Sequence, residues 1–104
     1  MDSKIIVTRL AALAQESRLA IFRELVQAGA PGLSAGKISE LTQTAPNSVS
    51  FHMKELVHAG LATSRQEGRY VIYNAHYLAM NELIAALTED CCKGETCGIE
   101  GSRG

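Results

Sequence analysis

The stretch from Ala45 to Asn74 constrains the fold of this chain more than any other part of its sequence. Apolar residues recur in its first half at intervals of three and four positions, which is the spacing of one helix face. These residues are Val49, Met53, Leu56 and Val57. Pro46 suits a first helical turn, where its missing N–H costs nothing, and Gly60 suits the position just after a helix end. The pattern predicts a helix that begins at Pro46 and stops at Gly60. Its outer face should carry Asn47, Phe51, Lys54 and His58.

A two-stranded ribbon is predicted directly after this helix. Leu61 to Arg65 has the composition of a strand, Glu67-Gly68 of a tight turn, and Tyr70 to Tyr73 of the returning strand. A helix with a polar N-terminal half can enter the major groove of DNA, and a ribbon with arginines beside its tip can lie along the backbone or in the minor groove. Periodicity alone leaves open the alternative of a buried helix packed on a hairpin with solvated charges.

Three motifs, in this order along the chain, resemble the ArsR/SmtB family of repressors. The first contains Leu13-Ala14, Ser17-Arg18-Leu19, Ile21 and Leu25. The second runs from Ser48 to Lys54 and continues with Leu56 and Ala59-Gly60-Leu61. The third is Glu67-Gly68-Arg69 with Val71 and Tyr73. They resemble, in turn, the core helix, the recognition helix and the wing of that family. The resemblance covers most of the chain and implies a mainly α fold with a small β-hairpin, that is, a winged helix-turn-helix that forms a homodimer through its terminal helices.

The remaining elements are expected to complete this fold. Residues 4–14 and 17–28 should form two helices, Leu33 a short strand beside the wing, and Ser34 the cap of a third helix. Inward-facing positions are expected at Ile6, Leu10, Leu13, Leu19, Phe22, Leu25, Val26, Ile38 and Leu41. Pro46 at the first helical position makes Ala45, a poor capping residue, the cap of the central helix, and Thr44 is the alternative.

The last helix is expected over residues 77–89. Its apolar residues are Leu78, Leu83, Ile84 and Leu87, and three alanines accompany them. Such a helix is more apolar than a solvated helix should be. A two-helix seam between the subunits of a dimer would explain this composition, and packing against its own domain is the alternative.

Length and charge limit the classes of protein to which the chain can belong. At 104 residues it is expected to be one domain with a modest core, which oligomerisation would help to stabilise. No run is long enough to span a membrane and the N-terminus lacks a secretion signal, so we expect no membrane partner and a cytoplasmic location. The net charge of −1 is divided unevenly, with a net +2 over residues 1–76 and a net −3 over residues 77–104. The DNA-reading part is therefore mildly basic.

All three cysteines lie close together near the C-terminus, at Cys91, Cys92 and Cys97. An odd number of cysteines in a reducing compartment argues against a disulfide framework. Soft thiolates select soft ions, and three sulfurs fall short of the four ligands of a usual structural zinc site. Arsenite, which takes three sulfurs in a pyramid, suits this set, and antimonite is close behind. Zinc or cadmium with a fourth ligand, and thiol oxidation, remain alternatives.

The family resemblance also bears on the sensor site. Many arsenic-responsive members carry cysteines on the helix before the recognition helix, and here Ile38 to Thr42 contains none. Many zinc-responsive members carry paired acidic and histidine ligands on the last helix, and here His76 stands alone. The resemblance therefore implies that the C-terminal cysteines are the sensor, with arsenite as the inducer. Residues 1–90 should form the winged-helix DNA-binding and dimerisation domain, and residues 91–104 a flexible tail.

The sequence thus predicts a homodimeric repressor that binds double-stranded operator DNA and is released by trivalent arsenic. The residues expected to read bases and backbone are Asn47, Ser48, Ser50, Phe51 and His52, and those expected to meet phosphates are Lys54, Arg65 and Arg69. His58 and His76 are expected at the surface. No nucleophile–base pairing or phosphate-binding glycine loop is present in the sequence, which argues against an enzyme. A redox-switched repressor and a winged-helix protein-interaction module are the competing functions.

Overall fold

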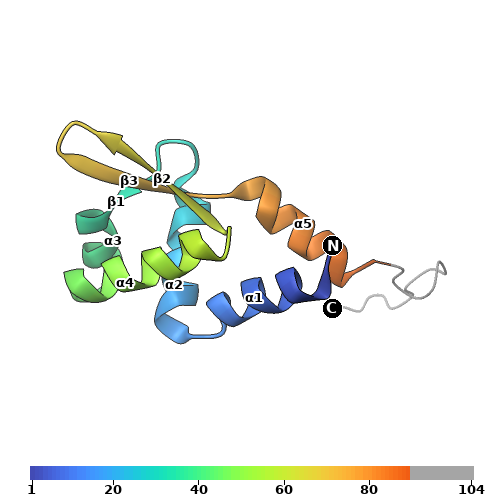
Figure 1. Ribbon diagram of the computed structural model, residues 1–104. Helices are drawn as coiled ribbons and strands as arrows, with labels where there is room; N and C mark the ends of the chain where they lie inside the picture. The colour runs from blue at the N-terminus through green and yellow to red at the C-terminus, as the bar shows by residue number, and fades with distance from the viewer. Residues whose placement is uncertain (90–104) are drawn as a thin grey trace.

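The computed structural model describes residues 1–89, so Cys91, Cys92 and Cys97 lie outside the described residues. Over these residues the chain forms five helices and three strands (Figure 1). In chain order they are α1 (Ser3–Leu13), α2 (Glu16–Ala28), β1 (Leu33–Ser34), α3 (Ala35–Thr42), α4 (Pro46–His58), β2 (Ala62–Glu67), β3 (Tyr70–Ala75) and α5 (Tyr77–Leu87). The expected winged helix-turn-helix is therefore confirmed, and its element boundaries agree with the predictions to within two residues.

The three strands form an antiparallel sheet in the order β1-β3-β2. Leu33 lies opposite Tyr73, which confirms the short strand beside the wing. The tight turn lies one residue later than predicted: Glu67 pairs with Tyr70, so the two loop residues are Gly68 and Arg69. Gly68 has φ 61°, the left-handed conformation that the first loop residue of such a hairpin requires and that glycine adopts without strain. The shift places Arg69 at the tip of the wing.

The core is built from the apolar faces of α2, α3 and α4 together with the start of the wing. Its fully buried side chains are Ile21, Leu25, Ile38, Val49, Met53, Leu56 and Leu61. Phe22 is buried among them, as expected, and Ile6, Leu13 and Val26 pack against the cluster as partly buried residues.

Four residues predicted to face inward are instead exposed. Leu10, Leu19, Leu41 and Val57 retain between 37% and 43% of their exposure. Each lies at the edge of the apolar stripe of its helix, and the structure places no neighbouring element over that edge. On α2, Ile21 fills the core together with Phe22 and Leu25 and is completely buried.

The helix ends follow the predictions in part. The hydroxyl of Ser34 accepts a hydrogen bond from the Lys37 amide at 3.1 Å, which confirms the cap of α3. Of the two N-caps considered for α4, the structure has Ala45, and no side chain caps the helix. The Thr44 hydroxyl bonds to Thr42 instead. At the other end of α4, Gly60 has φ 81°, as the predicted position after a helix end requires.

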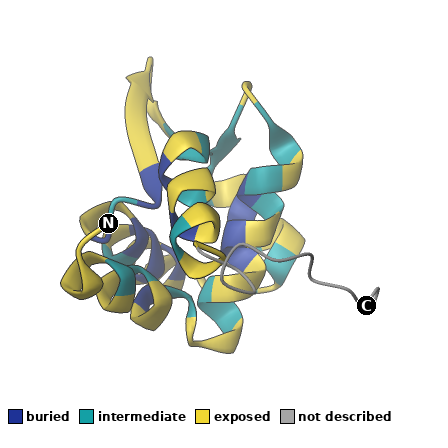
Figure 2. Ribbon diagram, turned by 90° about the vertical axis from the view of Figure 1, so that its right-hand side faces the viewer, coloured by how far each residue is buried: buried dark blue, intermediate teal, exposed yellow. Residues whose placement is uncertain are grey.

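The elements separate into two ends of the molecule. In Figure 1, α3, α4 and the wing lie at one end, and α1 and α5 extend together at the other. The wing projects from the body and is exposed along most of its length (Figure 2). Over residues 1–89, no helix is long and apolar enough to cross a membrane.

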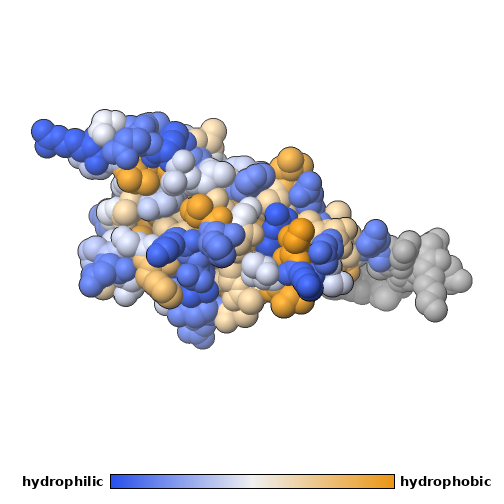
Figure 3. Space-filling view, in the orientation of Figure 1, coloured by the Kyte–Doolittle hydropathy of each residue, from blue (hydrophilic) through white to orange (hydrophobic). Residues whose placement is uncertain are grey.

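Apolar side chains stay exposed at the α1–α5 end. Leu78, Ile84 and Leu87 of α5 keep 65%, 52% and 55% of their exposure, so this helix packs only one face on its own domain. In Figure 3, hydrophobic surface gathers over this end of the molecule, whereas the wing is hydrophilic. The apolar composition of this helix, which predicted a seam between subunits, thus leaves apolar surface uncovered in the single chain.

Candidate nucleic-acid interface

A short turn fixes how α4 leaves α3. Gln43 ends α3 in the left-handed conformation, with φ 54°, which redirects the chain within three residues. The Ser39 hydroxyl donates to the Thr44 carbonyl at 2.5 Å, and the Thr44 amide donates to the Ser39 carbonyl at 3.2 Å. The α3–turn–α4 unit is therefore a helix-turn-helix whose second helix is held rigidly by hydrogen bonds within the turn.

The outer face of α4 is open to solvent. Asn47, Ser48, Ser50, Phe51 and Lys54 are all exposed. Because no side chain caps the helix, its first backbone N–H groups remain available beside these polar residues. Backbone N–H groups at a helix N-terminus favour anions such as phosphate. The structure therefore gathers five of the six residues predicted on this helix into one accessible surface, and leaves out only His52.

His52 is a correction to the predicted set. Its side chain is 8% exposed and lies on the inner face of α4 with Val49, Met53 and Leu56. Positions 49, 52, 53 and 56 form one stripe of a 3.6-residue helix, so residue 52 turns toward the core when residue 51 faces outward. His52 thus packs into the core instead of facing outward with the other five predicted residues of α4.

Arg18 of α2 contacts two neighbouring residues of α4, Phe51 and His52. Its Nε atom donates to Nδ1 of His52 at 3.3 Å, and its guanidinium lies 5.8 Å from the centre of the Phe51 ring. The rings of Phe51 and His52 meet edge to face at 5.7 Å. One buried imidazole and one cation therefore orient an exposed aromatic ring. Arg18 was predicted only as part of a helix motif, with no role at the interface.

The surroundings of His52 predict a pH dependence of stability. Burial lowers the pKa of the imidazole from its ordinary value of 6.5, and the charge of Arg18 lowers it further. The folded protein therefore binds this proton more weakly than the unfolded chain does. The contribution of His52 to the free energy of unfolding is complete above pH 6.5 and is lost as the pH falls below 6.5 toward the lowered value.

Urea unfolding of the wild type and of His52→Asn between about pH 8 and pH 5 checks this dependence. Asparagine cannot titrate but can accept the Arg18 hydrogen bond. We expect the wild type to lose more stability than the variant on acidification. If the free energy of unfolding changed with pH to the same extent in both proteins, titration of His52 would not contribute to the pH dependence of stability.

Arg65, the first of the two arginines in the wing, is held by hydrogen bonds within the protein. Arg65 donates from Nε to a carboxylate oxygen of Glu67 at 2.7 Å, from Nη2 to the Pro31 carbonyl at 3.1 Å, and from Nη1 to the Asn74 side chain. Asn74 in turn donates to the carbonyls of Gly29 and Ala30 at 3.1 and 3.0 Å. Arg65 was predicted to meet a phosphate; in the structure it joins the wing to the loop after α2. Asn74, which the sequence analysis did not single out, completes this junction.

Arg69 is the cation that the wing presents outward. It occupies the hairpin tip, and within residues 1–89 its side chain makes no hydrogen bond or ion pair. Arg69→Ala should weaken binding to specific and to random DNA by the same factor and reduce the slope of log affinity against log salt by about 1 for each wing that contacts the DNA.

Fluorescence anisotropy at several salt concentrations measures this slope. Arg65→Ala is the matched comparison, since it removes the same charge from the same ribbon. We expect it to disturb the wing while changing the salt slope less than Arg69→Ala does. A loss at Arg69 confined to the specific sequence would contradict its assignment to a phosphate.

The other two histidines differ in their surroundings. His58 is exposed, as predicted. His76 is half-buried, and its Nδ1 accepts a hydrogen bond from the Ala79 amide at 3.1 Å, so it caps α5 rather than lying free at the surface. No group of three or more potential metal ligands occurs within residues 1–89. The predicted cysteine site falls outside that range.

Comparison with known proteins agrees with this geometry. Residues 13–65 match the model of a family described as a helix-turn-helix domain. The HTH-type transcriptional regulator YgaV of Escherichia coli is 30% identical over 83 residues, which span 80% of this chain and 82% of that protein. An ArsR-like transcriptional regulator from Rhodococcus sp. RHA1 superposes with a TM-score of 0.72 at 26% identity, covering 82% of this chain and 77% of the other.

A further similar structure comes from Mycobacterium bovis. It is the homodimeric winged helix-turn-helix DNA-binding domain of a possible ArsR-family regulator, with a TM-score of 0.67 at 22% identity. The likeness covers 89% of this chain and 86% of that one. At this identity it concerns the fold alone.

Proposed function

The chain belongs to the helix-turn-helix family of transcriptional regulators, and from this premise we propose that it is a homodimeric repressor released from operator DNA by trivalent arsenic. The observation that supports DNA binding best is the combination of the open face of α4 with the outward Arg69 of the wing. Helix-turn-helix proteins place such a helix in the major groove. Asn47, Ser48 and Ser50 then face base edges, the Phe51 ring can touch a thymine methyl group, and Lys54 meets the backbone.

The apolar surface between α1, α2 and α5 supports the dimer. It forms a groove of about 520 Å³ lined by Leu10, Leu13, Leu19, Phe22, Arg23, Val26, Gln27, Leu61, Met80, Leu83, Ile84 and Leu87. A groove this apolar is costly to leave in water. The similar domain from Mycobacterium bovis is a homodimer. A second copy of this chain would bury the groove and set two α4 helices on successive major grooves, about one helical turn apart.

The choice of inducer rests on the chemistry of the cysteines. Cys91, Cys92 and Cys97 are the only thiols in the sequence, and they lie within seven positions just after α5. Trivalent arsenic binds three thiolates, and thiolates are the soft ligands that such an ion selects. In the sequence, these cysteines follow the helix that the proposed dimer buries. An inducer at this place can act on DNA affinity if it binds the DNA-free arrangement of the dimer more tightly.

Titration of arsenite into the reduced protein bound to its own promoter DNA tests this function. Fluorescence anisotropy follows DNA release, and zinc, cadmium and antimonite are titrated in parallel. We expect release at one arsenite per subunit and none with zinc. Release by zinc or cadmium alone would replace the inducer and keep the repressor. Release by an oxidant in the absence of ions, reversed by a dithiol, would favour the redox switch. Failure to bind any promoter fragment would favour a protein-interaction module.

A further inference from the structure

Arg9 of α1 connects the two ends of the molecule. Its Nε atom donates to the Ala59 carbonyl, just after α4, at 3.3 Å. Its Nη1 atom donates to the Ala79 carbonyl of α5 at 3.4 Å. These two partners lie 50 and 70 positions away along the chain. A single planar guanidinium thus joins the end of the recognition helix to the last helix.

The environment of Arg9 holds this arrangement tightly. Its side chain is 15% exposed, and the carboxylate of Glu82 lies 3.9 Å from Nη1. A Cβ atom added at Gly60 would lie 3.3 Å from the Arg9 guanidinium, so the backbone after α4 passes directly over this side chain. A cation at a helix C-terminus also meets the negative end of the helix dipole. Arg9 therefore has favourable partners on α4 and α5 at the same time.

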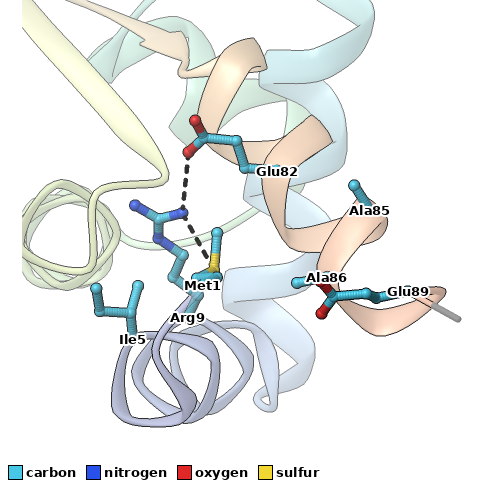
Figure 4. A pocket seen from close by; sticks show the side chains of 7 residues that line it. All are labelled: Met1, Ile5, Arg9, Glu82, Ala85, Ala86 and Glu89. Carbon is cyan, nitrogen blue, oxygen red and sulfur yellow. Dashed lines mark hydrogen bonds and ion pairs between the residues drawn. The ribbon is translucent and has the colours of Figure 1, made fainter.

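A cleft opens beside Arg9 between α1 and α5. It has a volume of about 410 Å³ and is lined by Met1, Ile5, Arg9, Glu82, Ala85, Ala86 and Glu89. Figure 4 shows Arg9 reaching across from α1 toward Glu82 on α5, with Glu89 just beyond the C-terminal end of that helix. The guanidinium forms one wall of this cleft and is hydrogen-bonded to Ala79 on α5. A shift of α5 relative to α1 must therefore move the guanidinium or break this bond. Either change would alter the hydrogen bond from Arg9 to the carbonyl of Ala59.

We propose that Arg9 is the positioning residue that couples α5 to the recognition helix, so that an event at the C-terminal end of α5 changes the affinity for DNA. Ala59 at the end of α4 also packs in the core with Ala12 of α1 and Leu83 of α5. The turn before α4 is fixed by the hydrogen bond of Ser39 to Thr44, and Arg18 holds His52 at the middle of the helix. Movement of the Ala59 end would tilt α4 about this turn. This coupling deepens the proposed function and rests on it, because the inducer site proposed there directly follows α5.

Arg9→Met tests the coupling, since methionine keeps an unbranched apolar side chain but removes all donors. Lys4→Met is the matched control: it removes one positive charge from an exposed position of the same helix. In the wild type and in Lys4→Met we expect arsenite to lower DNA affinity between about 5-fold and 150-fold, the usual range of allosteric coupling. In Arg9→Met the ratio of the DNA affinities without and with arsenite should fall close to 1. Arg9→Lys, which keeps the charge and can reach one carbonyl, should restore part of it.

A merely structural role gives a different result. Arg9→Met would then have a lower unfolding midpoint but the full arsenite ratio, and that outcome would overturn the proposal. If arsenite releases neither the wild type nor the control, the proposed function fails by itself, and a measurement without inducer still tests Arg9. Hydrogen exchange of the amides of Val57, His58 and Ala59 should be at least about 10-fold faster in Arg9→Met than in Lys4→Met. Equal exchange in the two variants would show that Arg9 does not hold α4.

Discussion

Replacement of Cys91, Cys92 and Cys97 by serine is expected to leave DNA binding intact and to abolish release by arsenite. Serine has nearly the size of cysteine, but its hydroxyl is a hard ligand that stays protonated, so it does not bind a soft trivalent ion. The residues proposed to touch DNA lie on α4 and the wing, and none of them changes. The ratio of DNA affinities without and with arsenite, about 5 to 150 in an ordinary allosteric protein, should become 1. Fluorescence anisotropy with promoter DNA measures both affinities.

Single substitutions make this prediction sharper. If all three sulfurs bind one ion, serine at any one position should weaken the response, because a two-sulfur site holds the ion less tightly. If thiol oxidation is the signal, two cysteines suffice, and one of the three single variants should respond like the wild type. Unchanged release by arsenite in the triple variant would remove the cysteines from the mechanism altogether.

Ile84→Glu is expected to dissociate the dimer and, with it, to abolish high-affinity operator binding. Ile84 is 52% exposed in the single chain and lines the apolar groove between α1, α2 and α5. A second copy would bury residue 84 from both subunits, so the substitution places two unpaired carboxylates in one seam. Burial of an unpaired charge costs several kcal/mol, and about 2.7 kcal/mol already weakens association 100-fold. The monomer can still contact one half-site, but it loses the second set of contacts.

Asn81→Glu is the matched control for this experiment. It adds the same charge to α5 at an exposed position that does not line the groove. Sedimentation velocity gives the oligomeric state of both variants, and anisotropy gives their DNA affinity. We expect a monomer for Ile84→Glu and a dimer for Asn81→Glu. A dimeric Ile84→Glu protein with full DNA affinity would place the seam on another surface.

Features that depend on neighbouring positions along the chain were predicted well. The stripe of Val49, Met53 and Leu56, the cap at Ser34 and the stop at Gly60 are all confirmed, because each depends on interactions within one helical turn. The wing was found for the same reason, since strand–turn–strand pairing is local. Its turn was displaced by one residue because both Glu67-Gly68 and Gly68-Arg69 contain the glycine that the turn needs.

Side chains with distant partners were not predicted. His52 was assigned to DNA and Arg65 to a phosphate, whereas the structure buries the first and ties the second to Pro31 and Asn74. Arg18 and Arg9 received no role, although one orients Phe51 and the other joins α4 to α5. A long arginine side chain carries no local signal of its partner, because its donors can reach any carbonyl that the fold brings near.

The sequence by itself determined which segments become helices and strands, where they stop, and that three thiols lie together after the last helix. Only the tertiary structure decided which polar residues face outward. Periodicity gives a helix an apolar stripe but does not say which edge a neighbour will cover, so Leu19 and Val57 stayed exposed and His52 did not. The bonds of Arg18 to His52, of Arg65 to Pro31 and of Arg9 to Ala59 and Ala79 span 34 to 70 positions. Such contacts exist only after packing has brought the elements together.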